Sequence, residues 1–344
     1  MSKDNETIHP PIDGPLTSSA TPRFAPDEMI RCETCLRANP PTRLKCMYCE
    51  AALEHSESSA HLRKPTLRQP EKHEPGFNCI LIPGAGGSKA AKQIEDAAAL
   101  LKLNPAELRR IIDADLPLPL ARTSSREEAA LVSERLRALL FESVVVADAD
   151  LGFSEELIVR PRSFQIMSDE LKISLPNIKG VVEIDWSDIH LVVSGRLVTT
   201  SIEVSERMSR KSENEILDTS EFFSDEAVFD IYDLKHEQTW RIGSLSFDFS
   251  CLQDQKTLVA GENLKRLNAL IISKTRSLRV EDSYKTLQPI LEPVWPRETE
   301  TKSRGWRRDG PGKYSLGATT LHSNEAQFTR YSRLCRYLAV NPLA

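Results

Sequence analysis

Four of the seven cysteines fall within one short window, in the pattern C-x2-C-x10-C-x2-C. In a reducing compartment thiols stay reduced, so this pattern indicates a metal site rather than two disulfides. Two C-x2-C pairs can place four thiolates around Zn²⁺ in a tetrahedron, which leaves no coordination position for water. The spacing therefore predicts a structural zinc site, and iron is a minor alternative for the same ligand set. The predicted ligands are Cys32, Cys35, Cys46 and Cys49.

A glycine-rich turn follows the apolar run 77–82 and precedes a predicted helix. Backbone N–H groups at such a turn can hold a phosphate. The turn completes neither the P-loop pattern nor the dinucleotide-binding pattern, so a structural turn is favoured over phosphate binding. The phosphate hypothesis rests on Gly84, Gly86, Gly87, Ser88 and Lys89.

Other combinations of reactive side chains are weak. His190 and His236 have no Ser or Cys motif beside them. Asp148 and Asp150 form a D-x-D pair that can hold Mg²⁺, but acids are common in turns. We therefore expect a protein that is not an enzyme.

The composition is typical of a soluble chain with packed cores. Of 344 residues, 40% are hydrophobic and 28% are charged, and no apolar run approaches the roughly 18 residues of a spanning helix. The opening MSKDNETIHPPIDG lacks the basic and apolar regions of a secretion signal, so a cytoplasmic location is expected. The net charge of −5 does not favour a polyanion, and nucleic-acid binding would need a local basic patch.

The elements that must position these residues begin after a stretch rich in proline and polar residues. We expect a disordered arm over 1–28, a zinc ribbon over 29–53 and a flexible linker over 54–75. Residues 76–150 then predict the order β-α-α-β-α-β. Its three helices are marked by Ser88, by Asn104 with Pro105 and Glu107, and by Ser125 with Glu128.

Residues 151–292 predict an α+β domain, because the hydrophobic period falls to two. Its strand-like runs are LKISL, GVVEI, IHLVV, RLVTTSIEV, VFDIY, QTWRI and FDFS. A helix with Leu258, Leu264, Leu267 and Ile271 on one face follows them. The acidic segment 205–230 is interpreted as a long mobile insertion.

Residues 293–344 predict a basic tail that ends in an amphipathic helix. Ser323 is its expected cap, and its apolar stripe is Phe328, Tyr331, Leu334 and Leu338. We favour docking of this helix on its own domain with Arg330, Arg333 and Arg336 at the rim. The alternative is a basic anchor for RNA, an anionic membrane or a partner groove.

The frame Cys32-x2-Cys35-x3-Asn39-x6-Cys46-x2-Cys49 resembles the Ran-binding type of zinc finger and also a short bacterial zinc ribbon. Ran-binding fingers usually carry a Trp two residues before the first cysteine, and their ubiquitin-binding members a Thr-aromatic pair after the second. Ile30 and Leu36 stand at those places. The resemblance therefore implies zinc, but not RNA stacking or ubiquitin binding, and a bead for protein contact is expected.

The sequence F-x-C-I-L-I-P-G-A-G-G-S-K, followed by two helices and S-S-R-E-E-A, resembles the C-terminal domain of the bacterial ribosomal stalk protein. The Clp protease adaptor shares that fold. The resemblance covers roughly residues 77–148 and implies a helical face for protein partners, without catalysis. Lys89 and Lys92 match the basic helix face of the stalk protein, whereas Glu95 and Asp96 do not.

The segment IDWSDI, with the paired strands and closing helix, resembles a pleckstrin-homology barrel. The expected fold class is thus multidomain α+β: a small zinc ribbon, a β-α-α-β-α-β stalk/adaptor-like domain and a seven-stranded pleckstrin-homology-like barrel with a closing helix. The expected function is a non-catalytic adaptor or scaffold for protein partners. The alternative is a nucleic-acid or ribosome-associated protein that uses the zinc ribbon and the basic tail.

Overall fold

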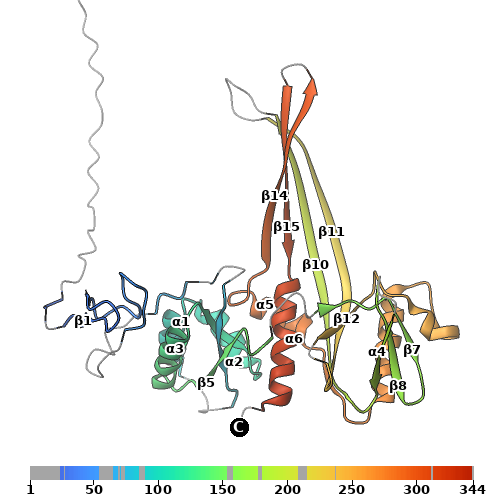
Figure 1. Cartoon of the computed structure of the whole chain (residues 1–344), viewed down its shortest axis with the longest axis horizontal. Helices are drawn as coiled ribbons and strands as arrows, with labels where there is room; N and C mark the ends of the chain where they lie inside the picture. The colour runs from blue at the N-terminus through green and yellow to red at the C-terminus, as the bar shows by residue number, and fades with distance from the viewer. Residues whose placement is uncertain are drawn as a thin grey trace, which may run out of the picture. The chain divides into compact units, whose positions relative to one another are not determined.

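The computed structural model divides the chain into two compact units, Met1–Lys64 and Pro65–Ala344 (Figure 1). The structure describes residues 24–26, 28–53, 65–68, 70, 74–84, 90–152, 158–176, 180–207, 215–236, 238–310 and 313–342. Most of the predicted arm 1–28 and much of the predicted linker 54–75 therefore lie outside the described residues. Each helix in the described part is too short or too polar to cross a lipid bilayer.

The first unit contains the cysteine window and very little apolar core. Strands β1 (Ile30–Arg31) and β2 (Ala38–Asn39) pair antiparallel. Its buried apolar cluster consists of Cys32, Cys46 and Leu53. So few buried groups supply too little hydrophobic stabilisation for an independent fold, which then depends on a cross-link or a bound metal.

The second unit begins with the predicted order β-α-α-β-α-β, which is confirmed. Its three strands form an antiparallel sheet in the order β4-β3-β5. The elements are β3 (Phe77–Leu81), α1 (Ala91–Leu101), α2 (Pro105–Asp113), β4 (Pro119–Thr123), α3 (Arg126–Ala138) and β5 (Ser143–Ala147). Helix α1 follows Ala90 as its N-cap residue, so the prediction of Ser88 as the cap was wrong.

Local capping sets the start of α2 as predicted. The Asn104 side chain accepts a hydrogen bond from the Ala106 N–H, and the Glu107 carboxylate accepts one from the Asn104 N–H, each at 2.9 Å. These reciprocal bonds satisfy N–H groups that have no partner within the helix. Pro105 at the first helical position needs no such partner.

Helix α3 departs from the predicted capping box at Glu128. The Ser125 hydroxyl accepts from the Glu128 N–H, as expected. The Glu128 carboxylate instead accepts from the N–H and hydroxyl of Thr66 and from the N–H of Leu67, at 2.6–2.8 Å. Lys102 donates to the Thr66 carbonyl from the other side. This part of the predicted linker is therefore fixed to the second unit.

A seven-stranded sheet forms the centre of the second unit. Its main path runs β14-β15-β10-β11-β12-β6, and β13 also pairs with β10. The strands are β6 (Ile158–Val159), β10 (Ile189–Arg207), β11 (Glu215–Asp233), β12 (Thr239–Gly243), β13 (Arg279–Glu281), β14 (Glu298–Gly310) and β15 (Lys313–Ser323). β14 and β6 lie at its two ends, and the described strands do not close a barrel.

Side chains alternate across this sheet and enter two different cores. Leu191 and Val193 of β10 join a cluster with helix α6 (Glu325–Val340) and helix α5 (Tyr284–Leu291). Val192, between them in sequence, joins the cluster on the opposite face with helix α4 (Ala260–Lys274). This alternation is the two-residue period of a strand that is covered on both faces.

A smaller antiparallel sheet, in the order β7-β8-β9, contributes to the α4 side. Its strands are β7 (Ser163–Ile166), β8 (Glu170–Ser174) and β9 (Val181–Asp185), and a 3₁₀ segment, η3 (Phe249–Gln255), follows later in the chain. The prediction of a strand at FDFS was wrong, because η3 begins within that run. Leu258 is fully exposed ahead of α4, while Leu264, Leu267 and Ile271 are buried as predicted.

The segment 205–230 is not a long insertion where the structure describes it. β10 extends to Arg207, β11 runs from Glu215, and the two strands pair along their length, with residues 208–214 outside the described part. Residues 298–310 and 313–323, predicted as tail, likewise form β14 and β15. The far parts of these four strands project beyond the helices as "the arm", defined as 198–207, 215–227, 298–310 and 313–323 (Figure 1).

Candidate metal centre

The cysteines lie on two knuckles of the same shape. In the first, the Leu36 N–H donates to the Cys32 carbonyl at 2.8 Å. In the second, the Glu50 N–H donates to the Cys46 carbonyl at 3.0 Å. Leu36 and Glu50 occupy the same place, one residue after the second cysteine of each pair, with φ of 59° and 60°. Each turn therefore holds a side-chain-bearing residue in the left-handed region that glycine adopts most readily.

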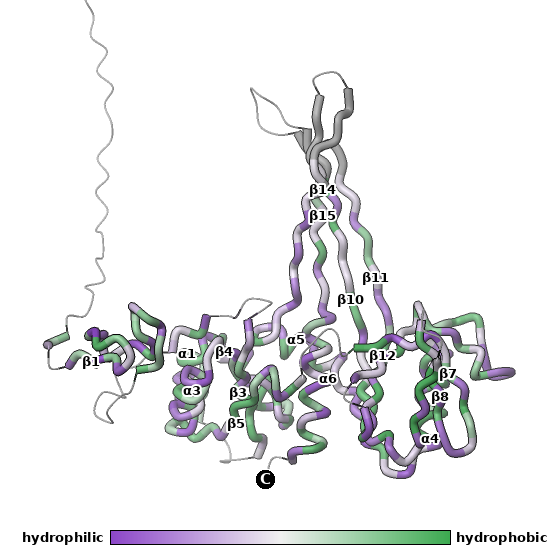
Figure 2. The backbone as a smooth tube through the Cα atoms, viewed as in Figure 1, coloured by the Kyte–Doolittle hydropathy of each residue, from purple (hydrophilic) through white to green (hydrophobic). Residues whose placement is uncertain are grey.

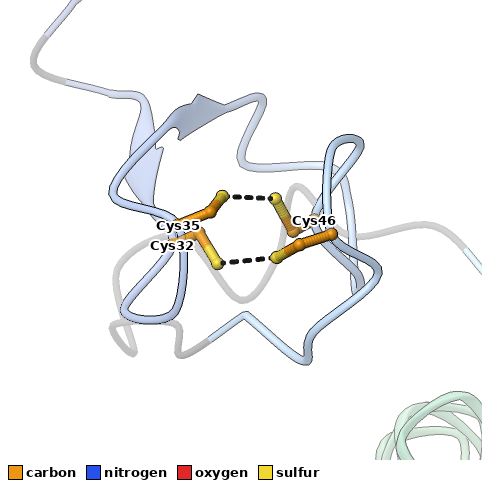
Figure 3. A group of neighbouring side chains, drawn as sticks. Cys32, Cys35 and Cys46 are labelled. Carbon is orange, nitrogen blue, oxygen red and sulfur yellow. Dashed lines mark hydrogen bonds between the residues drawn. The ribbon is translucent and has the colours of Figure 1, made fainter.

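The knuckles bring all four thiols together, as predicted (Figure 3). Their sulfur atoms lie within 4.8 Å of one another, with 3.6 Å between Cys32 and Cys49 and 3.5 Å between Cys35 and Cys46. A tetrahedron with metal–sulfur bonds of about 2.3 Å has edges of about 3.8 Å. These separations far exceed a disulfide bond of about 2.05 Å, and all four cysteines are free. The group can bind one metal ion.

Asn39 fixes the second knuckle against the first. Its side chain is completely buried and donates to the Arg37 carbonyl at 2.9 Å and toward the Cys46 sulfur at 3.4 Å. Its amide oxygen accepts from the Met47 N–H at 2.8 Å. Such outer contacts orient metal ligands and stabilise their thiolate form. The sequence shows Asn39 within the cysteine frame, but only the fold assigns this role.

The local dipoles favour thiolate at two of the four positions. The Cys35 N–H lowers the pKa of Cys32. Burial opposes ionisation of Cys46, but the N–H groups of Tyr48 and Cys49 lower its pKa to about 6. The Ala51 N–H favours ionised Cys49, whereas burial and the three neighbouring thiols raise its pKa to about 12. Four thiolates this close therefore require a cation to coexist.

Exposed apolar side chains surround the knuckles. We call Leu36, Met47 and Tyr48 the rim; they are 63%, 54% and 54% exposed. The Arg37 guanidinium lies 4.6 Å from the centre of the Tyr48 ring, which joins the two knuckles at the surface. The large exposed apolar side chains of this unit thus lie on the same two knuckles as the thiols.

The glycine-rich turn gives no further support for phosphate binding within the described residues. Gly84 has a φ of 71°, a conformation that explains glycine at this turn. Gly86, Gly87, Ser88 and Lys89 lie outside the described residues. Lys92 is exposed on the first turn of α1.

The C-terminal helix is buried on more sides than its sequence predicts. Its stripe, Phe328, Tyr331, Leu334 and Leu338, enters the core as expected. Asn324, rather than Ser323, is its N-cap residue. Arg330 and Arg333 are only 5% and 1% exposed, so their predicted place at the rim was wrong. The reason is that other segments of the second unit face this side of α6: Arg330 lies near Arg122 and Asp148, and Arg333 reaches the Gly152 carbonyl.

Arg333 and Arg336 contact segments of the second unit outside α6. Arg333 donates to the Gly152 carbonyl at 2.5 Å, and burial lowers its pKa. Arg336 lies over the Tyr232 ring, with its guanidinium carbon 5.4 Å from the ring centre, and donates to the His236 carbonyl. These contacts hold α6 to its own unit.

The acids of the D-x-D pair and His236 have structural partners, whereas both ring nitrogens of His190 are buried without a hydrogen-bond partner. Asp148 accepts from Arg122 at 2.5 Å and from Asn78 at 2.8 Å, and Asp150 accepts from the Ala147 N–H. The D-x-D pair is thus used within the fold. His236 bonds Asp233 at 2.8 Å, but that carboxylate also accepts from the buried Trp240 ring.

One buried ion pair was missed by sequence analysis. Arg241 is completely buried and donates from two nitrogens to Asp230, at 2.8 and 2.9 Å. Burial lowers its pKa, but Asp230 more than compensates and the pKa is raised. Ser332 of α6 also donates to Asp230 at 2.7 Å. The alternation VFDIY and TWRI was a usable signal, since each strand places one charge between core residues.

Comparison with protein-family models, with curated proteins and with solved structures finds no match for this chain. The metal-binding geometry therefore carries the functional argument.

Proposed function

We infer that this protein is a non-catalytic adaptor whose N-terminal unit is a structural zinc module that docks a protein partner. The observation that carries this proposal is the combination of a four-thiol cluster with an exposed apolar rim on the same two knuckles. A closed thiolate set stabilises a fold but offers no open position for catalysis.

Zinc is the metal that this donor set favours. Four sulfur ligands from two knuckles suit a tetrahedral ion with no redox chemistry, and zinc is more common than iron in such sites. The buried Asn39 amide beside Cys46 supplies the outer contact that these sites usually have. Elemental analysis of protein purified without chelators should find one zinc per chain.

The rim is the proposed contact surface for the partner. Its three side chains gain hydrophobic stabilisation only when another surface covers them, at about 25 cal/mol per Å² of apolar area buried. Arg37 over Tyr48 adds a cationic group beside the apolar ones, a combination that is common at protein interfaces. The described part of the second unit shows no comparable group of thiols.

A matched pair of glycine variants tests the rim without disturbing the turns. Leu36→Gly removes an apolar side chain and relieves a positive φ, while Glu50→Gly relieves the same φ at the equivalent place and leaves the rim intact. Both variants should retain zinc. Quantitative affinity purification from the native host should lose specific proteins only with Leu36→Gly.

The same pair of variants can also contradict the proposal. Equal recovery of every protein with Leu36→Gly and with Glu50→Gly would remove the rim from partner binding. Absence of both zinc and iron from the purified chain would remove the metal module itself.

A second candidate function is binding of single-stranded nucleic acid by the same unit. The stacked Arg37 and Tyr48 favour it, because bases stack on exposed aromatic and guanidinium groups. Retention on RNA that weakens steeply with salt would support it, since phosphate contacts release counterions. Partner capture that is insensitive to nuclease and salt would favour the adaptor.

A further inference from the structure

The arm is a single layer of four strands that extends beyond both cores. Its strand order is β14-β15-β10-β11, and one row across it joins Thr301, Thr320, Ile202 and Glu221. Among the arm side chains that the structure describes, none is buried. In Figure 2 the coloured part of the arm is mostly pale to purple, whereas the base of the same strands is greener. A sheet covered on neither face lacks the apolar packing that normally stabilises strands.

The two faces of the arm can be assigned from the base of β10. Val192 faces α4, and Leu191 and Val193 face α6, so the alternation continues outward along the strand. The register contains no bulge between Leu191 and Ser205. We call the α4 side of the arm its neutral face, defined by even-numbered residues 198–204 of β10 and their cross-strand neighbours.

The neutral face is mainly aliphatic and hydroxylic. It carries Val198, Ile202 and Val204 on β10 and the 66% exposed Phe223 on β11. Two side-chain contacts cross it, Thr301 to Thr320 at 3.1 Å and Thr299 to His322 at 2.9 Å. Its acids in the described rows, Glu221 and Asp225, both lie on the outer strand β11, and Asp225 is paired with Arg196.

The opposite face carries charges on β10 and β14. It carries Glu203 on β10 and Glu298, Glu300 and Lys302 on β14, together with Phe222 and Leu321. Charges at the two outer strands oppose the addition of a further strand, as in natural edge protection. The neutral face is therefore the surface of the arm best suited to being covered.

The charge of the described rows of the arm restricts what can cover them. Its described side chains between 198–204, 219–227, 298–303 and 317–323 include six carboxylates and one lysine. That balance opposes a polyanion or an anionic membrane. The hydroxyl groups make the face too polar to enter lipid, so a protein surface without strong charge is the matching occupant.

A second copy of this chain supplies such a surface with the same size and twist. The rows 198–204 across four strands measure about 19 by 24 Å, or about 450 Å² in projection, from usual strand spacings. A standard interface buries about 800 Å² on each partner. The face is thus large enough for a reversible dimer and too small for an obligate one.

We propose that two copies of the protein associate through the neutral faces of their arms, stacked as the two layers of a β-sandwich. Side chains of facing sheets interdigitate at a separation of about 10 Å, and a two-fold axis makes the contact self-complementary. The dimer covers Phe223, which is exposed in the single chain, and Ile202 and Val204, which are half-buried there.

Neighbouring threonines on β15 give a matched test with the full-length chain. Thr320 faces the neutral side and Thr319 the charged side, opposite Ile202 and Glu203 respectively. Sedimentation equilibrium should show a concentration-dependent dimer for the unsubstituted protein and for Thr319→Glu. Thr320→Glu should raise the dimer dissociation constant by about a hundredfold, because symmetry places two new charges in the contact.

Two controls keep the outcome decisive. Circular dichroism melting should be the same for both variants, and Ile202→Ser should weaken the dimer if the glutamate variant unfolds the arm. The dimer should persist in high salt, since most of its contact is uncharged and its acids lie on the outer strand β11. A monomer at every concentration, a dimer that salt dissolves, or equal weakening by Thr319→Glu and Thr320→Glu would each overturn the proposal.

Discussion

The cysteine module, residues 29–53, and the base of the seven-stranded sheet are stabilised in opposite ways. In its described residues the module has a small buried cluster of Cys32, Cys46 and Leu53 and places four thiols around one point. The sheet base buries Trp240, Phe229 and many other side chains in two clusters. A fold with almost no core depends on a bound ion, whereas a fold with a large core can also contain a buried ion pair.

The largest expected effect unfolds the cysteine module and leaves the second unit unchanged. Cys46→Ser removes one of four metal ligands, so the module should lose its metal and unfold, since binding free energy is folding free energy in such units. The melting transition of the second unit should not change, because its cores contain no residue of the module. Elemental analysis measures the metal content, and calorimetry measures the melting transition of the second unit. A shift in that melting transition would contradict the independence of the two units.

The second expected effect is confined to the second unit. Arg241→Leu leaves Asp230 buried without its guanidinium and should lower the free energy of unfolding by about 3–5 kcal/mol. Arg196→Leu is the matched control, because the Arg196–Asp225 pair is half exposed and such pairs contribute about 0–1 kcal/mol. Urea unfolding should rank the two variants in this order with zinc content unchanged, and equal losses would refute the distinction.

Lowering the pH should have a smaller effect on stability, and this effect should differ between the second unit and the cysteine module. Burial opposes ionisation of Asp148, but Arg122 and Asn78 lower its pKa. Its stabilising contribution is therefore present above the unfolded-state pKa of about 3.9 and is lost as the pH falls through the lower folded value. Stability curves of the unsubstituted protein and Asp148→Asn should converge below about pH 4.

The module should respond at a milder pH, because protonation of its thiolates releases the metal. As the pH is lowered, the module should therefore lose its metal before the second unit loses stability. A difference between the Asp148→Asn variant and the unsubstituted protein that stays constant with pH would show that this carboxylate does not titrate with unfolding.

Sequence analysis succeeded where one local rule decides the structure. The cysteine spacing identified the four thiols, and Asn104 with Glu107 identified the start of α2. The apolar period of the last helix identified its buried stripe. Each of these signals depends on residues a few positions apart.

It failed where distant segments decide the environment. Side chains of the arm alternate between two uncovered faces, so segment 205–230 shows no apolar period and resembles an insertion. Arg330 and Arg333 look solvent-facing until the α/β part packs against α6. Glu128 looks like half of a capping box until Thr66 approaches it from a remote part of the chain.

The central position of β10 also constrains when the protein can fold. β10 pairs with β11 on one edge and with β15 on the other, although β15 is among the last elements of the chain. Pairings between such distant segments form slowly, because the entropy of closing a long loop is lost before the new contacts provide any stabilisation. During synthesis the outer part of β10 therefore has an open edge until β15 has left the ribosome, so this part of the sheet cannot be completed before β15 is made.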